Sequence, residues 1–149
     1  MKIVLQRVKQ ASVSVQGQVK GRIGKGICLF IGIERGDTEE DARYFAQKIL
    51  GLRIFPDEND RMNLSLSDIE GEVLAVSQFT LAGSVRKGRR PSFDGAEKPE
   101  RAKKLFDDFI DRVRKEGVRV ETGVFGAVMD VHLINDGPVT FILERKRHT

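Results

Sequence analysis

The pair Gly137-Pro138 interrupts an apolar, strand-like stretch near the end of the chain, and it limits the fold more than any other feature. Proline lacks the N–H that a central strand needs, and bonds that precede proline are the ones that adopt the cis form at modest cost. Glycine beside it lets another molecule approach the main chain closely. The pair therefore predicts a place where a sheet presents backbone carbonyls to a ligand.

A second unusual stretch, Ser77-Gln78-Phe79-Thr80-Leu81, ends the alternating strand predicted over Glu72–Leu81. Its polar residues meet the loop that begins at Ala82-Gly83. One interpretation is structural, since such side chains often bond nearby backbone and turn the chain. The functional interpretation is an oxyanion site, in which Gln78 or main-chain N–H groups stabilise charge on a carbonyl oxygen. Met129 is assigned to core packing or to an apolar pocket near this site.

The remaining pattern predicts one domain over residues 1–149, of the α+β class with mixed strand directions. One helix is expected to begin at Asp37 or Thr38 and stop at Gly51, and another to begin at Pro99 and end at Gly117. Residues 56–63 read as a polar loop. Strands are predicted at residues 2–8, 11–15, 19–23, 27–33, 52–55, 72–81, 118–121, 127–134 and 139–145.

Composition removes several classes of catalyst. The chain has a single cysteine, Cys28, inside an apolar run, so we expect a buried and inert thiol. Its two histidines, His132 and His148, are too few for a histidine-rich zinc site, and we expect neither a metal nor another cofactor. No signal-peptide core or membrane-spanning run is present, which favours a cytoplasmic protein. An enzyme of this composition would work without the usual ionisable groups.

The loop that follows the polar strand end is rich in cations. It carries Arg86, Lys87, Arg89 and Arg90, and the whole chain has a formal charge of +4 and a pI near 9.4. A solvated basic loop is common and needs no function. Placed directly after the polar strand end, however, it also resembles an electrostatic funnel for phosphates.

These residues resemble the D-aminoacyl-tRNA deacylase family, first called D-tyrosyl-tRNA deacylase, and the resemblance runs nearly end to end. The matching motifs are Gln6-Arg7-Val8 with Ala11-Ser12-Val13, Leu52-Arg53-Ile54-Phe55, Ser77-Gln78-Phe79-Thr80-Leu81, Gly88-Arg89-Arg90-Pro91-Ser92-Phe93, Thr122-Gly123-Val124-Phe125-Gly126-Ala127 and Asn135 to Thr140. One small departure is Val128, where the family favours an acidic residue before Met129.

The resemblance implies a hydrolase that cleaves the ester joining a D-amino acid to the terminal adenosine of tRNA, in translation quality control, and that accepts glycine mischarged on tRNA-Ala as well. It implies a homodimer of chains with two face-to-face sheets and two main helices. In that dimer a cis Gly137-Pro138 of one subunit reaches into the site of the other. The cations at positions 86, 87, 89 and 90 would bind the tRNA.

Two chemical routes remain open. In the first, the N–H of Phe79, with Thr80 N–H and Gln78, holds the oxyanion while a water attacks the ester. In the second, the Thr80 hydroxyl is a covalent nucleophile, although its motif holds no base to activate it. Because an aminoacyl ester is already activated, modest polarisation of its carbonyl can suffice.

The protein would discriminate between D- and L-aminoacyl groups by steric exclusion of the L form. Carbonyls beside Gly137 and Pro138 would bind the substrate's α-ammonium, and with the ester also fixed, rigid backbone would exclude the L form. Arg7 would brace this loop. The other expected substrate-binding residues are Ser77, Met129, Val139 and Thr140. The alternatives are a non-catalytic tRNA-binding module and an editing-domain relative that acts on L-aminoacyl-tRNA.

Overall fold

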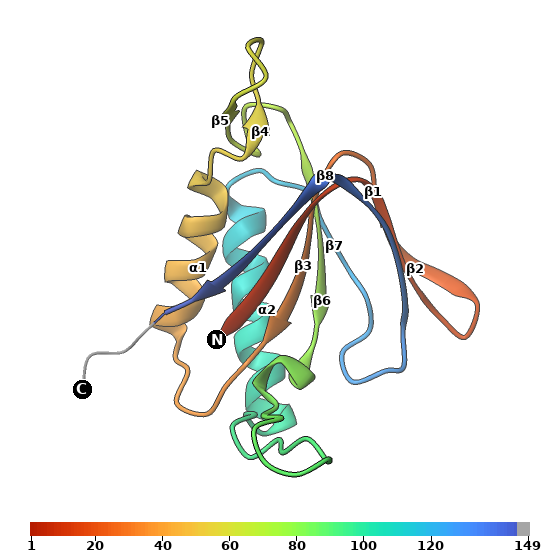
Figure 1. Cartoon of the computed structure of the whole chain (residues 1–149), viewed down its shortest axis with the longest axis vertical. Helices are drawn as coiled ribbons and strands as arrows, with labels where there is room; N and C mark the ends of the chain where they lie inside the picture. The colour runs from red at the N-terminus through yellow and green to blue at the C-terminus, as the bar shows by residue number, and fades with distance from the viewer. Residues whose placement is uncertain (146–149) are drawn as a thin grey trace.

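The computed structural model describes residues 1–145, and the four C-terminal residues, His148 among them, lie outside the described part (Figure 1). The elements, in chain order, are β1 (Lys2–Val15), β2 (Gln18–Ile23), β3 (Gly26–Gly32), α1 (Glu39–Gly51), β4 (Phe55–Pro56), β5 (Met62–Leu64), β6 (Glu72–Ser77), the 3-10 helix η1 (Phe79–Ala82), α2 (Pro99–Lys115), β7 (Val120–Thr122) and β8 (Asp130–Glu144). None of the described helices is long and apolar enough to cross a membrane.

Strand β1 is the centre of a six-stranded sheet. The order is β2-β1-β3-β6-β7, and β8 also pairs with β1. Strands β1, β2, β3 and β8 pair antiparallel, whereas β3 with β6 and β6 with β7 pair parallel. A separate two-stranded ribbon joins β4 and β5. Directions are therefore mixed, as the sequence predicts.

The sheet bends along β1, because its first half pairs with β3 and its second half with β2. Helices α1 and α2 cover one face, and their apolar side chains form the main core with residues such as Leu5, Leu29 and Phe109 (Figure 1). A second core fills the bend, where Val13 and Ile23 pack with Leu74 and Val76. The α+β class is confirmed. The two face-to-face sheets remain a prediction, since the described strands form one large sheet and one ribbon.

Close contact between β3 and β6 depends on Gly26. A Cβ atom at this position would overlap the main chain of Glu72, so only glycine permits the pairing. The thiol of Cys28 lies in the same strand and is fully buried, which confirms the prediction for it. Burial raises the pKa of this thiol to about 12, so it stays protonated at neutral pH.

Both helices match the sequence prediction closely. The Asp41 carboxylate accepts the Thr38 N–H (2.9 Å) where α1 begins. Proline 99 is the first residue of α2, and Gly117, with φ of +83°, follows its end. The apolar residues of α2 recur at the helical period and are buried: Ala102, Leu105, Phe106, Phe109, Ile110 and Val113.

Several strand boundaries differ from the prediction. Residues 2–8 and 11–15 form one strand, β1, that stays paired with β8 across its bend. Likewise, 127–134 and 139–145 belong mostly to one strand, β8, because both halves pair with β1. The strand predicted over 52–55 reduces to β4, and β5 includes part of the predicted polar loop. The strand expected to reach Leu81 stops at Ser77, because Leu81 N–H bonds back to Gln78 O (3.2 Å) and turns the chain.

Candidate active site

The parallel strands β3 and β6 end side by side, and a mostly apolar cavity of about 590 Å³ opens at that edge of the sheet. The loop before β8 and the start of α2 complete its wall. Four predicted site residues line it: Ser77, Gln78, Phe79 and Met129. Other lining residues are Ile33, Arg35, Val76, Phe93, Ala96, Glu97, Lys98, Pro99, Ala102, Phe125, Gly126, Ala127 and Val131.

The turn after β6 leaves two main-chain donors available. Gln78 N–H donates to Ile31 O (2.8 Å), and the chain then enters η1. Within residues 1–145, the N–H groups of Phe79 and Thr80 have no hydrogen-bond partner. Both residues are exposed. Adjacent free N–H groups at the edge of an apolar cavity are suited to bind an oxygen that gains negative charge.

The Thr80 hydroxyl is tied to its neighbour. The Gln78 amide donates to Thr80 Oγ1 at 2.5 Å, so this oxygen already accepts a hydrogen bond. Accepting a bond lowers the electron density on the hydroxyl oxygen, whereas a nucleophile needs a base that takes its proton. The local geometry therefore fits a positioning role for Thr80 better than attack.

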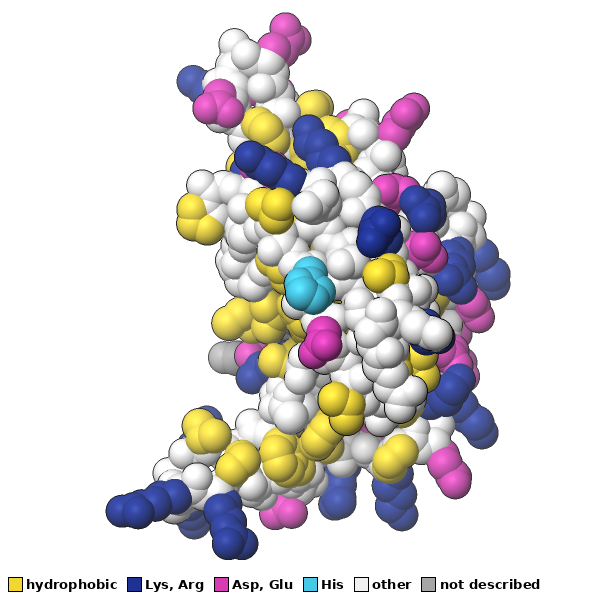
Figure 2. Space-filling model, turned by 90° about the vertical axis from the view of Figure 1, so that its right-hand side faces the viewer, with side chains coloured by type: hydrophobic (Ala, Val, Ile, Leu, Met, Phe, Trp, Pro, Cys, Tyr) yellow, Lys and Arg dark blue, Asp and Glu magenta, His cyan; other side chains and the backbone are white. Residues whose placement is uncertain are grey.

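The cationic residues Arg86, Lys87, Arg89 and Arg90 lie together on the exposed loop between η1 and α2. Paired bonds between Ser84 and Ser92 (2.7 and 2.8 Å) close the base of this loop. The ring of Phe93 stacks obliquely on that of Phe79, with centroids 5.2 Å apart, so the loop is attached to the cavity wall. The loop lies at the lower end of the molecule (Figure 1), where Lys and Arg side chains project into solvent (Figure 2).

The Gly137-Pro138 pair lies elsewhere in the chain. Its peptide bond is cis, as predicted, and both residues are exposed. Asn135 fixes the loop by accepting Val139 N–H (2.7 Å) and donating to Thr140 Oγ1 (3.1 Å). The side chain of Val139 is buried and that of Thr140 is exposed.

Arg7 holds the same loop from below. Its guanidinium is buried, and it donates to Asp136 O (3.0 Å) and to Ile54 O (2.7 Å). The Asp136 carboxylate lies 3.5 Å from Arg7 Nε and balances its charge. The guanidinium therefore connects the loop to the segment before β4.

Within one chain the two predicted halves of the site are far apart. Arg7 pairs with Ile27 of β3, whereas Ser77 lies beside Ile31 of the same strand. Four residues of strand separate these levels by about 13 Å. Gly137, Pro138, Val139, Thr140 and Arg7 are accordingly absent from the cavity lining.

Sequence reasoning missed the charged rim of the cavity, which consists of Arg35, Glu97 and Lys98. The Arg35 side chain donates to Ala96 O (3.3 Å), and Glu97 accepts from Arg101 (3.2 Å). A signal did exist for Arg35, because it closely follows the apolar run that becomes β3. Chain segments that leave parallel neighbours at the same edge converge there.

Comparison with known proteins identifies the family of this chain. The model of the family described as D-Tyr-tRNA(Tyr) deacylase matches residues 4–144. The chain belongs to this family. It is 59% identical over 145 residues to a D-aminoacyl-tRNA deacylase of Pelobacter propionicus, covering 97% of this chain and 100% of the relative. It is 56% identical over 147 residues to one of Koribacter versatilis, covering 99% of both.

A solved structure extends the likeness to three dimensions. The c-Myc DNA Unwinding Element Binding Protein superimposes with a TM-score of 0.92 and 43% identity, covering 99% of this chain and 100% of that one. The expected resemblance to the deacylase family, and with it the hydrolase class, is confirmed. Among the described residues no group of three or more His, Cys, Asp or Glu could hold a metal ion.

Proposed function

We propose that this chain hydrolyses the ester bond between a D-amino acid and the terminal adenosine of tRNA, releasing both. The observation that carries the proposal is the pair of free N–H groups, at Phe79 and Thr80, beside the apolar cavity. Relatives 56–59% identical to the chain over almost their whole length are named D-aminoacyl-tRNA deacylases. The cavity supplies apolar walls for the adenosine and the aminoacyl group.

In the proposed reaction the ester carbonyl oxygen receives the N–H groups of Phe79 and Thr80. A water molecule attacks the carbonyl carbon, and the oxyanion that forms stays bound to these donors. When the intermediate collapses, the ribose oxygen leaves and takes a proton. Main-chain donors alone are sufficient here, because the aminoacyl ester is activated.

A substitution at Thr80 can distinguish attack by water from covalent catalysis by the Thr80 hydroxyl. Replacing Thr80 with valine removes the hydroxyl but keeps the main-chain N–H. On the water route, single-turnover deacylation of D-tyrosyl-tRNA slows by less than about tenfold, since only the bond with Gln78 is lost. A fall to the uncatalysed rate would show that the Thr80 oxygen attacks the ester and would overturn the main-chain mechanism.

We further propose that the functional unit is a homodimer in which Gly137-Pro138 of each chain completes the partner's cavity. The support is geometric: the pair is exposed and is held by Asn135 and by Arg7, and Arg7 itself lies about 13 Å along the sheet from Ser77 of the same chain. A second copy can bring the two together. A Gly137→Ala chain mixed with a Phe79→Pro chain would regain one intact site per heterodimer, and the mixture would recover activity.

Selectivity for handedness follows from this arrangement. Main-chain carbonyls at Gly137 and Pro138 would hold the α-ammonium while the Phe79 turn holds the ester, so the side chain of an L-amino acid would meet rigid backbone. D-amino acids of many kinds, and glycine on tRNA-Ala, would be accepted because nothing grips the side chain. Strong discrimination among D-amino acids by side-chain type would contradict this account.

The decisive experiment is deacylation of D- and L-tyrosyl-tRNA by the purified chain in parallel. Hydrolysis of the D form alone supports the proposal. Hydrolysis of the L form would indicate an editing relative, and binding without hydrolysis would indicate a tRNA-binding module. The basic loop at residues 86–90 is proposed to bind the tRNA backbone, and a cytoplasmic location is proposed together with the tRNA substrate.

A further inference from the structure

A second concave surface lies outside the sheet's bend, on the face turned away from the second core. It is a polar groove of about 680 Å³ formed by β1, β2 and β8. Strand register sets its composition. Ser12 of β1 pairs with Arg22 of β2 on one side and with His132 of β8 on the other, so the three side chains share one face.

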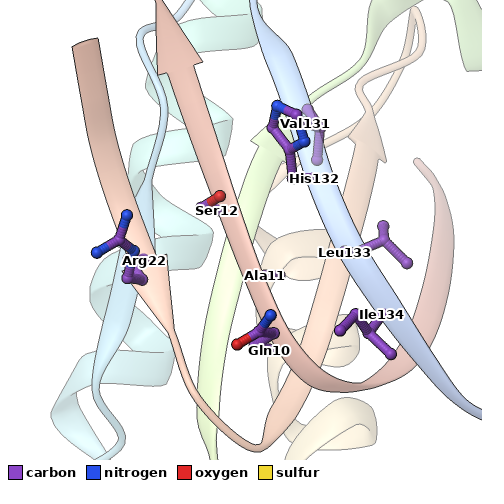
Figure 3. A pocket seen from close by; sticks show the side chains of 8 residues that line it. All are labelled: Gln10, Ala11, Ser12, Arg22, Val131, His132, Leu133 and Ile134. Atoms are coloured by element: carbon purple, nitrogen blue, oxygen red, sulfur yellow. The ribbon is translucent and has the colours of Figure 1, made fainter.

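This row is shaped to hold an anion. Ser12 is small and lies between two longer side chains, and Figure 3 shows Arg22 and His132 on the strands that flank it. Neighbouring strands are about 4.8 Å apart, so the tips of Arg22 and His132 can approach one phosphate bound above Ser12. Gln10, two residues before Ser12 on the same face of β1, adds an amide donor.

The two side chains that flank Ser12 are not used by the protein itself. Throughout residues 1–145 the structure gives the Arg22 guanidinium and the His132 ring no hydrogen-bond or ion-pair partner, and both are exposed. Lys9 and Lys20 are also exposed on these strands and add positive charge. Asp130, two residues before His132 on the same strand, pairs with Ser14 and lies outside the residues that line the groove.

The groove adjoins the proposed active site. Val131 contributes to the lining of both, and His132 lies three residues beyond Met129, about 10 Å along an extended chain. A nucleic acid whose terminal nucleotide occupies the cavity must lead its backbone away across a nearby surface. This surface offers the guanidinium, hydroxyl and amide donors that phosphate contacts use.

We propose that the Arg22–Ser12–His132 row binds a phosphate of the substrate's RNA backbone, as a second contact separate from the basic loop. This inference rests on the proposed function, because it takes the tRNA whose end enters the cavity as the ligand. It predicts that Arg22 affects binding of the whole tRNA and not the chemical step.

The test compares Arg22→Gln with Lys48→Gln, which removes an exposed cation from helix α1. Binding of uncharged tRNA is measured from about 50 to 200 mM salt. For R22Q the tRNA Kd rises roughly three- to tenfold, and the slope of log affinity against log salt falls by about 1. K48Q matches the unsubstituted chain in both. Ser12→Ala, which keeps the charge, weakens binding with an unchanged slope.

Hydrolysis supplies the second measurement. With D-tyrosyl-adenosine, which has no backbone phosphate, R22Q and the unsubstituted chain have equal rates. An unchanged salt slope in R22Q, an equal change in K48Q, or an equal loss on D-tyrosyl-adenosine would overturn the groove proposal. If the unsubstituted chain hydrolyses neither substrate, the proposed function fails, and an unchanged R22Q binding slope still refutes the groove by itself.

Discussion

Replacing Arg7 with methionine isolates what the buried guanidinium does. Methionine keeps the apolar stem and removes every donor. Two charge-assisted hydrogen bonds are lost, to Asp136 O (3.0 Å) and Ile54 O (2.7 Å). Each such bond contributes about 1.5–3 kcal/mol, and part of that loss is offset because methionine carries no cost of burying a charge. We expect the free energy of unfolding to fall by about 2–3 kcal/mol.

Urea unfolding followed by circular dichroism measures this change, with Arg53→Met as the matched control. Arg53 donates to Asn63 O (2.9 Å) on the exposed surface, so its loss should cost under about 0.5 kcal/mol. Parallel deacylation of D- and L-tyrosyl-tRNA tests the loop itself, and R7M should lower the ratio of D to L rates. An R7M free energy of unfolding within 0.5 kcal/mol of the R53M value would refute the reasoning.

Three further predictions follow from the site and the sheet. Phe79→Pro removes one free N–H at a position that tolerates proline, so single-turnover deacylation should slow by about 10²–10³-fold, whereas Phe79→Leu stays near the original rate. The Gly24 N–H and Arg119 hold the pKa of the Glu72 carboxylate below its ordinary 4.5. The ionised carboxylate therefore stabilises the folded protein above pH 4.5, and this contribution is lost as the pH falls through the lowered pKa. In Glu72→Gln the free energy of unfolding, measured against pH, should fall less steeply in this acid range. Cys28, with its raised pKa, should resist alkylation at pH 8 until the chain unfolds, and rapid labelling of the folded protein would contradict its burial.

The helices could be predicted because their signals are local. Proline 99 and Gly117 mark the two ends of α2, and the apolar residues between them recur at the helical period. Strand ends were less predictable, since alternation continues past Ser77 although the chain already turns there. Nothing local distinguishes Phe79 in a strand from Phe79 in η1. The bond from Gln78 N–H to Ile31 O, after which the chain turns, depends on how β3 lies beside β6.

Only part of the candidate site could be predicted from the sequence, for a related reason. Gln78, Phe79 and Met129 could be proposed because their residue types and motifs mark them. Lys98 carries no such mark, and Arg35 is indicated only by its place just after the apolar run of β3. The two residues meet at the cavity through the parallel pairing of β3 with β6 and the placement of α2. That pairing joins segments distant in the chain, so one sequence does not reveal it.

The length of the loop that carries Gly137-Pro138 is fixed, because β8 pairs with β1 both before and after it. Asn135 lies opposite Val8 and Thr140 opposite Gln6, so five steps along β8 span two steps along β1. Removing one residue between them would shift every later partner by one and reverse the side-chain faces. Leu143, which packs on the main core opposite Ile3, would then point away from it. Insertions and deletions in this loop are therefore opposed by the folding of the whole C-terminal strand, whatever they do to catalysis.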